Sequence, residues 1–296
     1  MKRILLLGRN GQVAWELRRT LAPLGEVIAL DRHSSPSVDL ASIDTLAPAI
    51  RAFRPDTIVN AAAYTAVDKA EEEPQQAEQI NAIAPAVMAE EAEKLGALLV
   101  HYSTDYVFSG DAATPYREED PLDPQSIYGH SKLAGEQAIV SSGASYLILR
   151  TAWVYGARGH NFLLTMLRLM KEREQLGVVD DQIGSPTWSR LIAEATAQIL
   201  AQQFKGQQQQ GIYHLTCAGQ TSWYGFACKI RDLGLQWGLL DNKAALVNPI
   251  GSEAYPTPAK RPAYSVLNND KLKNTFGLQL PDWQQALELC MESLAG

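Results

Sequence analysis

The sequence from Ile4 to Ala14, ILLLGRNGQVA, joins a short apolar run to a glycine-rich turn. Apolar residues then recur at four-residue steps up to Leu21, which is typical of a helix. A strand, a glycine turn and a helix in this order form the dinucleotide fingerprint. Gly8 permits the tight turn, Gly11 lets backbone N–H groups approach a pyrophosphate, and Ala14 packs the helix on the strand. The pattern predicts a dinucleotide site at this turn, with Gly8, Gly11 and Val13 at the cofactor.

The next strand predicts how the cofactor's adenosine ribose is held. Residues 27–30 form a short apolar run that ends at Asp31 and Arg32. An acidic residue about 20 positions after the glycines binds a ribose 2′-hydroxyl, as in NADH, whereas an arginine pairs with a 2′-phosphate, as in NADPH. Both residue types are present, so we expect the protein to use NADPH or NADH.

Composition limits the classes of protein to consider. The chain has 296 residues, of which 46% are hydrophobic, enough for one large domain and a smaller one. Its net charge of -7 argues against a general surface for nucleic acid or anionic membranes. The three cysteines have no metal-ligand spacing and suit a reducing compartment, and no apolar run reaches transmembrane length. We therefore expect a cytoplasmic protein that binds neither nucleic acid nor membrane.

Short apolar segments alternate with helical patterns along the first half of the chain. Strands are expected at 57–60, 98–102 and 146–150, with helices at 75–95 and 124–140 between them. Continuous apolar strands separated by helices indicate a parallel sheet covered on both faces. The predicted fold class is α/β, a doubly wound parallel (Rossmann) sheet with a smaller C-terminal substrate-binding domain.

The alternation loosens after residue 150, which sets the expected domain boundary. We assign residues 1–151 to the dinucleotide-binding domain and residues 152–296 mainly to the substrate domain. Strand patterns at 176–180 and 211–215 flank a helical pattern at 189–203, so segments near 176–217 are candidates to return to the first domain. Residues 252–262 carry three prolines and are expected to form an ordered, non-helical loop.

A tyrosine and a lysine at helical spacing are the strongest catalytic signal. Tyr128 and Lys132 stand at i and i+4 in Tyr128-Gly129-His130-Ser131-Lys132, and so lie on one helix face. A free tyrosine titrates near about 10, and a neighbouring ammonium favours the phenolate and lowers that pKa. The spacing alone occurs often by chance on solvated helix faces. It gains weight from the residues that follow the predicted strands.

Those residues place polar groups at one edge of the sheet. The strand at 98–102 leads into Ser103-Thr104-Asp105, and the strand at 57–60 leads into Ala61-Ala62-Ala63. In a doubly wound sheet, residues beyond the carboxyl ends of the strands line the ligand crevice. A hydroxyl at Ser103 or Thr104, the Tyr128 phenol and the Lys132 ammonium would meet there. This set is suited to proton transfer to a carbonyl beside a nicotinamide.

Several motifs together carry a resemblance to a known family. Gly8-x-x-Gly11-x-x-Ala14, Asn60-Ala61-Ala62, Ser103 to Phe108 and Tyr128-x-x-x-Lys132 resemble the extended short-chain dehydrogenase/reductases. Within that superfamily, nearly the whole chain resembles the dTDP-4-dehydrorhamnose reductase family. The motifs that carry this closer resemblance are Ala63 to Glu71, Arg150 to Gly156, Asn161-Phe162, Asp181 to Thr187 and Tyr255 to Pro262.

The resemblance implies an activity and a role for each site residue. The activity is reduction of the C4 ketone of dTDP-4-dehydro-L-rhamnose, the last step of dTDP-rhamnose biosynthesis, which feeds cell-wall or O-antigen polysaccharide. Tyr128 would donate a proton to the C4 oxygen, Lys132 would lower the tyrosine pKa and hold the nicotinamide ribose, and Thr104 would polarise the carbonyl. Asp105, Trp153, Asn161 and Arg261 would contact the substrate. Asn10, Gly11 and Gln12 would cradle the pyrophosphate, and Ala62, Ala63 and Tyr64 would flank the nicotinamide.

Simpler explanations compete for some of these residues. Trp153 can equally be a core residue, since tryptophans are usually highly buried. An exposed loop arginine is the commoner outcome for Arg261. His101 and His130 are expected to be structural or solvated, because the mechanism gives them no task. The carboxylates Glu118, Glu119, Asp120 and Asp123 are expected to be exposed.

Two alternative functions remain open at this stage. The first is another nucleotide-sugar enzyme of the superfamily, such as a 4,6-dehydratase or a 4-epimerase. Tyr106 follows Asp105 where such dehydratases typically place a glutamate, which disfavours dehydration. The second is a non-catalytic regulatory subunit, against which the intact Thr104, Tyr128 and Lys132 argue.

Metal binding and assembly also rest on the resemblance. Some members of the family are described as dimers with Mg²⁺ held by interface glutamates, so a homodimer is an open expectation. Glu16 stands where one such ligand would be, but Arg190 occupies part of the corresponding second helix. We therefore expect no metal, and none is needed for the hydride chemistry.

Overall fold

The computed structural model describes all residues from 1 to 296, and a six-stranded parallel sheet is at its centre. The strand order is β2-β1-β3-β4-β5-β10. The strands are β1 Lys2–Leu7, β2 Gly25–Leu30, β3 Thr57–Asn60, β4 Leu98–Thr104, β5 Ser145–Thr151 and β10 Gly211–His214. The order reverses between β1 and β3, which creates the crevice where doubly wound sheets bind ligands. The predicted Rossmann sheet is confirmed.

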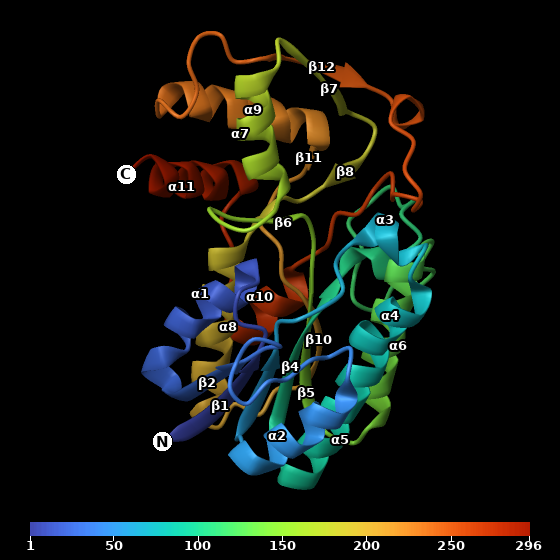
Figure 1. Cartoon of the computed structure of the whole chain (residues 1–296), viewed down its shortest axis with the longest axis vertical. Helices are drawn as coiled ribbons and strands as arrows, with labels where there is room; N and C mark the ends of the chain where they lie inside the picture. Colours follow the sequence, from blue (N-terminus) through green and yellow to red (C-terminus); the bar gives the residue numbers. More distant parts are fainter.

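Helices cover both faces of this sheet (Figure 1). One face carries α1 Gln12–Thr20 and α8 Ser189–Phe204, and the other carries α2 Leu46–Phe53, α5 Ala84–Leu95 and α6 Ile127–Ser141. Strand β1 shows why two layers are needed, because successive side chains point to opposite faces. Ile4 and Leu6 join the apolar core on the α1 side, whereas Leu5 and Leu7 join the core on the α2 side.

A smaller lobe lies beyond the carboxyl ends of the strands (Figure 1). Its helices are α7 Phe162–Glu172, α9 Trp223–Gln236 and α11 Trp283–Ala295. Its short strand pairs are β7 Gln175–Val179 with β12 Leu246–Ile250, β8 Ile183–Gly184 with β11 Thr221–Ser222, and β6 Val154–Tyr155 with β9 Thr187–Trp188. The core on the α1 side continues into this lobe through Tyr155 and Trp188, so one packed interior joins the two parts.

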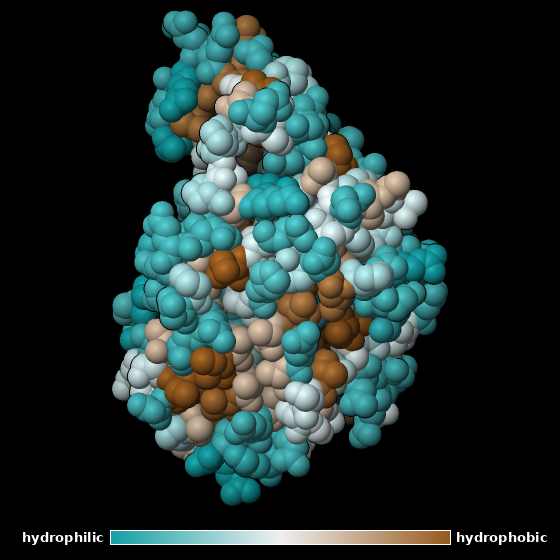
Figure 2. All heavy atoms as spheres, turned by 90° about the vertical axis from the view of Figure 1, so that its right-hand side faces the viewer, coloured by the Kyte–Doolittle hydropathy of each residue, from teal (hydrophilic) through white to brown (hydrophobic).

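The surface on the side of α4 (Pro74–Glu78) and α6 is mostly hydrophilic. Apolar atoms gather there in separate patches on the lower, larger part of the molecule (Figure 2). No helix in the structure combines the length and apolar character needed to cross a membrane.

The segments after residue 150 divide between the two parts of the molecule. Helix α8 packs on α1, and β10 pairs with β5 at the edge of the central sheet. The expected strand at 176–180 forms as β7, but it pairs with β12 in the smaller lobe instead of joining the central sheet. Thus the chain leaves the sheet after β5, returns at α8 and β10, and leaves again.

Two helix boundaries differ from the sequence prediction. The helix expected from residue 124 begins at Ile127, because the Ser126 hydroxyl caps it by accepting a hydrogen bond from the Gly129 N–H at 3.1 Å. The helix expected over 75–95 forms as α4, a π-helical segment Gln79–Ile83, and α5. The π-helical turn lies where α6 comes closest, since a Cβ on Gly135 would lie 2.1 Å from the Asn81 carbonyl oxygen.

Candidate active site

One face of α6 carries three functional groups into the interior. Tyr128, Lys132 and Glu136 are spaced four residues apart and all three are buried. The start of the helix can approach closely because Gly129 has no side chain, and a Cβ there would lie 2.4 Å from the Tyr106 carbonyl oxygen. Helix α6 can therefore press against the segment that follows β4 and bring Tyr128 to the crevice.

The carboxyl end of β4 supplies the groups that face Tyr128. Thr104 and Asp105 are buried, and the Thr104 hydroxyl donates to Asp105 Oδ1 at 2.9 Å. The other carboxyl oxygen of Asp105 has no hydrogen-bond partner, and neither has the hydroxyl of Ser103, Thr151 or Ser265. Buried polar atoms without partners are costly, so several of them together at a strand end mark a place built to receive polar ligand atoms.

Burial controls the ionisation of this cluster. Burial raises the pKa of the Asp105 carboxyl to about 6, although the hydrogen bond from the Thr104 hydroxyl favours its ionised form. Burial also raises the pKa of the Tyr128 phenol above its usual value, and the nearby Thr104 hydroxyl only partly offsets this. The Tyr106 ring contacts Tyr128 edge-on, with ring centroids 5.5 Å apart.

The expectation that Lys132 lowers the Tyr128 pKa is not met in this structure. The two residues share a helix face, but the long lysine side chain ends on β4. Its Nζ lies 2.7 Å from the Tyr102 carbonyl oxygen and 3.1 Å from His101 Nε2. Burial lowers the pKa of Lys132 to about 8, against the opposing charge of Glu136. His101, expected to be structural or solvated, is therefore buried in direct contact with a proposed catalytic group.

The glycine-rich turn has the form needed to hold a diphosphate. Gly8 has φ +94°, in the region that favours glycine, and a Cβ there would lie 3.2 Å from the backbone of Ala61. Gly11 is the N-cap of α1 and offers no side-chain cap. The first N–H groups of α1, beginning at Gln12 and Val13, have no partner within the helix. The arrangement fits a dinucleotide whose pyrophosphate lies at this helix end.

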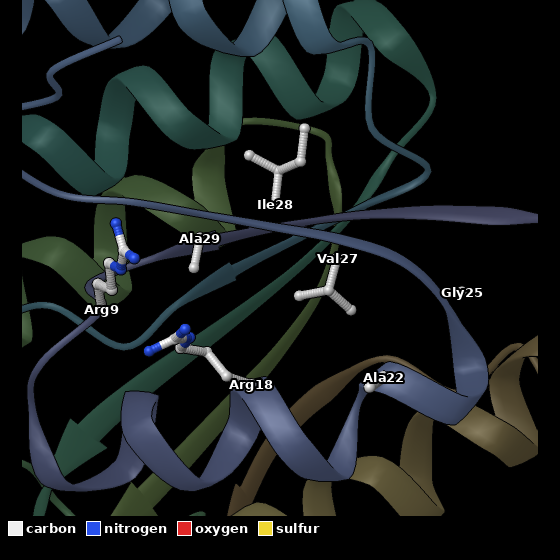
Figure 3. Close-up of a pocket in the computed structure, with 7 residues that line it drawn as sticks. All are labelled: Arg9, Arg18, Ala22, Gly25, Val27, Ile28 and Ala29. Atoms are coloured by element: carbon white, nitrogen blue, oxygen red, sulfur yellow. The ribbon is translucent and has the colours of Figure 1, made fainter. Parts of the chain in front are cut away.

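Asp31 and Arg32, the two residues expected near the adenosine ribose, differ in how firmly other protein groups hold their side chains. Asp31 accepts from the Asn10 amide at 3.0 Å and from the His33 N–H at 2.8 Å, so its carboxylate is held beside the glycine turn. Arg32 is exposed, and its Nε lies 3.1 Å from His33 Nε2. A pocket along β2 offers two other cations, Arg9 and Arg18, whose side chains line it near Ala29 (Figure 3).

The side chain of Asn81 fixes the backbone of Tyr64, in the segment after β3, by two hydrogen bonds. Asn81 accepts from the Tyr64 N–H at 2.9 Å and donates to the Tyr64 carbonyl at 3.0 Å. The Tyr64 hydroxyl donates to Glu73 at 2.7 Å. Ala62 and Ala63, between β3 and Tyr64, are half-buried.

Trp153 is half-buried and its backbone is in an uncommon conformation. Its φ of +47° lies in the left-handed region, and its indole stacks on Trp223 with ring centroids 3.4 Å apart. Gly184 makes room for it, because a Cβ there would lie 2.4 Å from the indole. Trp153 is therefore only partly in the core, and its stacking on Trp223 fixes the orientation of the indole.

Asn161 and Arg261 are both held by other protein groups. The Asn161 side chain caps α7 by accepting from the Leu164 N–H, and its amide donates to Gln12 Oε1 at 2.8 Å. This capping role differs from the expected substrate contact. The Arg261 guanidinium donates to Asp68 at 2.6 Å and to the Tyr106 hydroxyl at 2.9 Å. It is therefore not a free loop arginine, since Tyr106 links it to Tyr128.

Comparison with known proteins assigns the family. The family model described as the RmlD substrate binding domain matches residues 1–295. A dTDP-4-dehydrorhamnose reductase of Burkholderia thailandensis is 49% identical over 300 residues, which cover 99% of each chain. The chain belongs to the RmlD substrate-binding-domain family.

Solved structures of dTDP-4-dehydrorhamnose reductases have the same fold. The protein of Clostridium acetobutylicum superposes with a TM-score of 0.91 at 38% identity, over 99% of each chain. That of Bacillus anthracis, solved in complex with NADP, gives a TM-score of 0.88 at 37% identity, over 99% of this chain and all of the other. The likeness to these members extends over both the sheet and the smaller lobe.

Arg190, on the helix that would carry a second metal ligand, makes an ion pair within that helix. No three His, Cys, Asp or Glu side chains gather as a metal site would require. Arg190 Nε pairs with Glu194 at 2.9 Å, one turn along α8. The position therefore carries a cation of its own.

Three features of this RmlD-family site were not predicted from the sequence. They are the pairing of His101 with Lys132, the link from Arg261 to Tyr106, and the two arginines beside β2. Only the contact between His101 and Lys132 could have been anticipated from the sequence. Asn60 and His101 are polar residues in buried strands, and they occupy paired positions in neighbouring strands β3 and β4.

Two of the expected surface carboxylates, Glu118 and Asp120, are also partly buried. Glu118 accepts from the His214 N–H at 2.8 Å, and burial raises its pKa. The prediction that this residue is exposed is wrong, because β10 joins the sheet edge next to it. His130, in contrast, is exposed on α6 as expected.

Proposed function

We propose that this protein reduces the C4 ketone of dTDP-4-dehydro-L-rhamnose to dTDP-L-rhamnose with NADPH or NADH. The observation that carries the proposal is the convergence of the Thr104 and Tyr128 hydroxyls, both buried, in a chain 49% identical to a reductase with this name. Hydroxyl donors fixed in a dry site are what a ketone needs as negative charge develops on its oxygen.

Tyr128 is the proposed acid. Its raised pKa keeps the phenol protonated at neutral pH, so it enters the reaction able to donate its proton to the C4 oxygen. Thr104 would donate to the same oxygen and polarise the carbonyl. Lys132 would stabilise the phenolate left behind and contact the nicotinamide ribose. The bound nicotinamide supplies the hydride.

The dinucleotide would lie along the carboxyl ends of β1, β2 and β3. Gly8, Asn10, Gly11, Gln12 and Val13 are the proposed diphosphate contacts, supported by the uncapped start of α1. Asp31 is the proposed ribose contact. Ala62, Ala63 and Tyr64 are the proposed contacts on the nicotinamide side, supported by the rigid hold of Asn81 on Tyr64.

Cofactor choice is proposed to depend on the cations near the end of β2. Arg32→Ala should raise the KM for NADPH more than that for NADH, by a few-fold, because it removes a cation from the 2′-phosphate. Arg9→Ala and Arg18→Ala test the pocket of Figure 3 in the same assay. If these two variants discriminate between the cofactors and Arg32→Ala does not, the pocket arginines replace Arg32 in this role. Steady-state kinetics with each cofactor measures the outcome.

The nucleotide sugar is proposed to bind between the sheet and the smaller lobe. Asp105 would accept a sugar hydroxyl, Trp153 would present its fixed indole, and Arg261 would pair with the diphosphate. Asn161 is retained only as an indirect contributor, because capping α7 occupies its side chain. Residues 152–296 would provide most of this half of the site, and residues 1–151 with α8 and β10 the cofactor half.

Cellular context is part of the same proposal. A nucleotide-sugar reductase of this charge is proposed to work in the cytoplasm and to bind neither nucleic acid nor membrane. A homodimer is proposed from the resemblance, and sedimentation of the pure protein tests it. No role is proposed for Mg²⁺, and activity should be unchanged by EDTA.

The deciding experiment follows cofactor absorbance with dTDP-4-dehydro-L-rhamnose supplied. A reductase consumes one NADPH or NADH for each product molecule formed. A 4-epimerase or 4,6-dehydratase would regenerate its cofactor and show no net consumption. A regulatory subunit would bind the dinucleotide, as titration of cofactor fluorescence would show, without turning over. Either of these two results would overturn the proposal.

A further inference from the structure

A buried line of three polar side chains leads from the sheet to Lys132. Asn60 on β3, His101 on β4 and Lys132 on α6 are each at most 2% exposed. Asn60 Nδ2 lies 3.0 Å from His101 Nδ1, and His101 Nε2 lies 3.1 Å from Lys132 Nζ. Both ring nitrogens of His101 therefore have a partner, and turning the ring over would lose both contacts.

The orientation of the Asn60 amide follows from a backbone group. The Ala62 N–H can only donate, and it points at the Asn60 side-chain oxygen at 3.2 Å. The Asn60 oxygen must therefore face Ala62, which leaves the NH₂ group facing His101. Because an NH₂ group donates, His101 Nδ1 must accept and carries no proton.

The ring then has one place left for its proton. Burial lowers the pKa of His101 far below its ordinary value, so the ring is neutral. A neutral imidazole with a bare Nδ1 carries its proton on Nε2. That N–H points at Lys132 Nζ. An ammonium has three donors and no lone pair, so it cannot accept this hydrogen bond, whereas a neutral amine can.

We propose that Asn60 and His101 are positioning residues that hold the neutral-amine form of Lys132, and that protonation of Lys132 frees its side chain from His101. The proposal rests on the function proposed above, because it assigns these residues to the lysine of that same site. The neutral amine accepts from His101 Nε2–H and donates to the Tyr102 carbonyl. When Nζ takes up a proton from solvent, two donors face each other, and the contact with His101 breaks. The released ammonium can then turn along α6 toward Tyr128.

The charged groups around Lys132 are few and can be named. Glu136 lies one turn along α6, and both its oxygens are bonded to Arg150 of β5 at 2.9 and 2.7 Å. His101 faces Lys132 from β4, and Tyr128 precedes it on α6. The fixed pair of Glu136 and Arg150 leaves the His101 hydrogen bond as the contact that depends on the Lys132 proton.

The direct test reads the proton on His101 by ¹⁵N NMR of the imidazole nitrogens in the full-length protein. The expected spectrum shows a bare Nδ1 and a protonated Nε2 for His101. His214 is a built-in control, because its Nδ1 faces the Asn268 carbonyl at 3.1 Å and must carry a proton. His101→Gln and His214→Gln assign the two sets of signals. A protonated Nδ1 on His101 overturns the proposal, whether or not the protein reduces any sugar.

A second test changes the hydrogen-bond direction. In Asn60→Asp the side chain accepts from both Ala62 N–H and His101 Nδ1–H, which leaves Nε2 bare and able to accept from an ammonium. Reduction that needs the ammonium should fall in wild type as the pH rises through about 8. In Asn60→Asp this fall should move upward by about one pH unit or more, a tenfold change in the proton affinity of Lys132.

Two further variants separate this effect from charge and from folding. Asn60→Asp adds a negative charge, so His101→Gln, which is neutral and can offer an oxygen to Nζ, should shift the pH profile in the same direction. His214→Gln removes an equally buried histidine away from Lys132 and should leave the profile unchanged, whatever it does to Tm. Unshifted profiles in both Asn60→Asp and His101→Gln would overturn the proposal. If neither variant folds, the ¹⁵N spectrum of the wild type decides.

Discussion

Two buried polar clusters lie within a few turns of helix α6 and differ in how completely they are hydrogen-bonded. At Glu136, both carboxylate oxygens accept from Arg150. That guanidinium also donates to the Glu118 carbonyl at 3.4 Å and lies 5.1 Å from the centre of the Phe108 ring. At Tyr128, in contrast, three hydroxyls and one carboxylate oxygen from neighbouring residues have no partner.

The difference separates a group that holds the fold from a group that waits for a ligand. Burial alone does not distinguish them, because Arg150 and Thr104 are both buried. The two clusters differ in how many of their polar atoms have a hydrogen-bond partner within the protein. A buried ion pair with every oxygen bonded is self-sufficient, whereas unpartnered atoms at a strand end are satisfied only when something else binds. The comparison predicts that changes in the first cluster affect stability and changes in the second affect activity.

The largest effect is expected at Tyr128. Tyr128→Phe removes the proposed proton donor and little binding surface, so kcat should fall by about 10²–10⁴-fold, as for the loss of a general acid. Cofactor affinity and Tm should hardly change. Stopped-flow reduction and cofactor titration measure the two quantities. A variant that keeps more than about a tenth of the wild-type kcat, an effect of at most ~1.4 kcal/mol, would show that Tyr128 is not the acid.

Glu136→Gln, in contrast, should lower the stability of the protein. It leaves the buried Arg150 charge without its carboxylate, which typically costs about 3–5 kcal/mol of the free energy of unfolding. Denaturant unfolding measures the loss. The matched control is Ser265→Ala in the other cluster, which removes an unpartnered hydroxyl and should leave the free energy of unfolding within about 1 kcal/mol of wild type. Equal losses in the two variants would contradict the comparison.

Asp105 should link the second cluster to pH. Its folded-state pKa of about 6 lies above the ordinary 3.8, so the folded protein holds a proton that the unfolded chain releases between these values. The ionised carboxyl therefore costs stability above about pH 6, and the cost disappears as the pH falls. Asp105→Asn should be more stable than wild type near pH 8 and lose this advantage toward pH 4.

The same carboxyl should affect substrate binding. Below about pH 6 the protonated wild-type side chain loses an acceptor, so the KM for the nucleotide sugar should rise. In Asp105→Asn the KM should be higher at neutral pH and should not change over this range. Thermal unfolding and kinetics at matched pH values test both statements. A stability difference that stays constant from about pH 4 to 8 would mean that Asp105 does not titrate in this range.

The smallest of these effects is expected at Arg261, at the rim of the second cluster. Arg261→Ala should lower kcat/KM for the nucleotide sugar by about tenfold, because remote contacts to the substrate help to orient its reacting carbon. Cofactor affinity should stay unchanged. Lys260→Ala is the matched control, since its exposed ammonium reaches only Gln125 at 3.0 Å. Equal effects of the two substitutions would exclude a specific role for Arg261.

Much of the fold could be predicted from short-range patterns. The strand expected at 57–60 is β3 without change, and the helix expected after the glycine turn is α1. These elements depend on periodicity and on glycine geometry, which act over a few residues. The strand at 176–180 shows the limit. Its apolar pattern predicts a strand, but whether it joins the central sheet or pairs with β12 depends on residues about 70 positions later.

The candidate site was predictable in its members and less so in their contacts. Thr104, Tyr128 and Lys132 meet near the carboxyl end of β4, as the topology of a doubly wound sheet requires. The spacing of Tyr128 and Lys132 could not show that the lysine ends on His101, nor that burial would raise the pKa of the Tyr128 phenol. Desolvation depends on everything packed around a group, and no local pattern contains that.

The sequence by itself determined the parallel sheet, the glycine turn and the helix face shared by Tyr128 and Lys132. Each follows from residues near one another in the chain, through side-chain alternation, backbone freedom or helical spacing. Only the tertiary structure decided which buried polar atoms find partners. The bonds that matter join residues 41 positions apart for Asn60 and His101, 31 for His101 and Lys132, and 193 for Asp68 and Arg261. Whether such atoms meet depends on how the layers pack, and that packing sets the protonation of the groups proposed to do the chemistry.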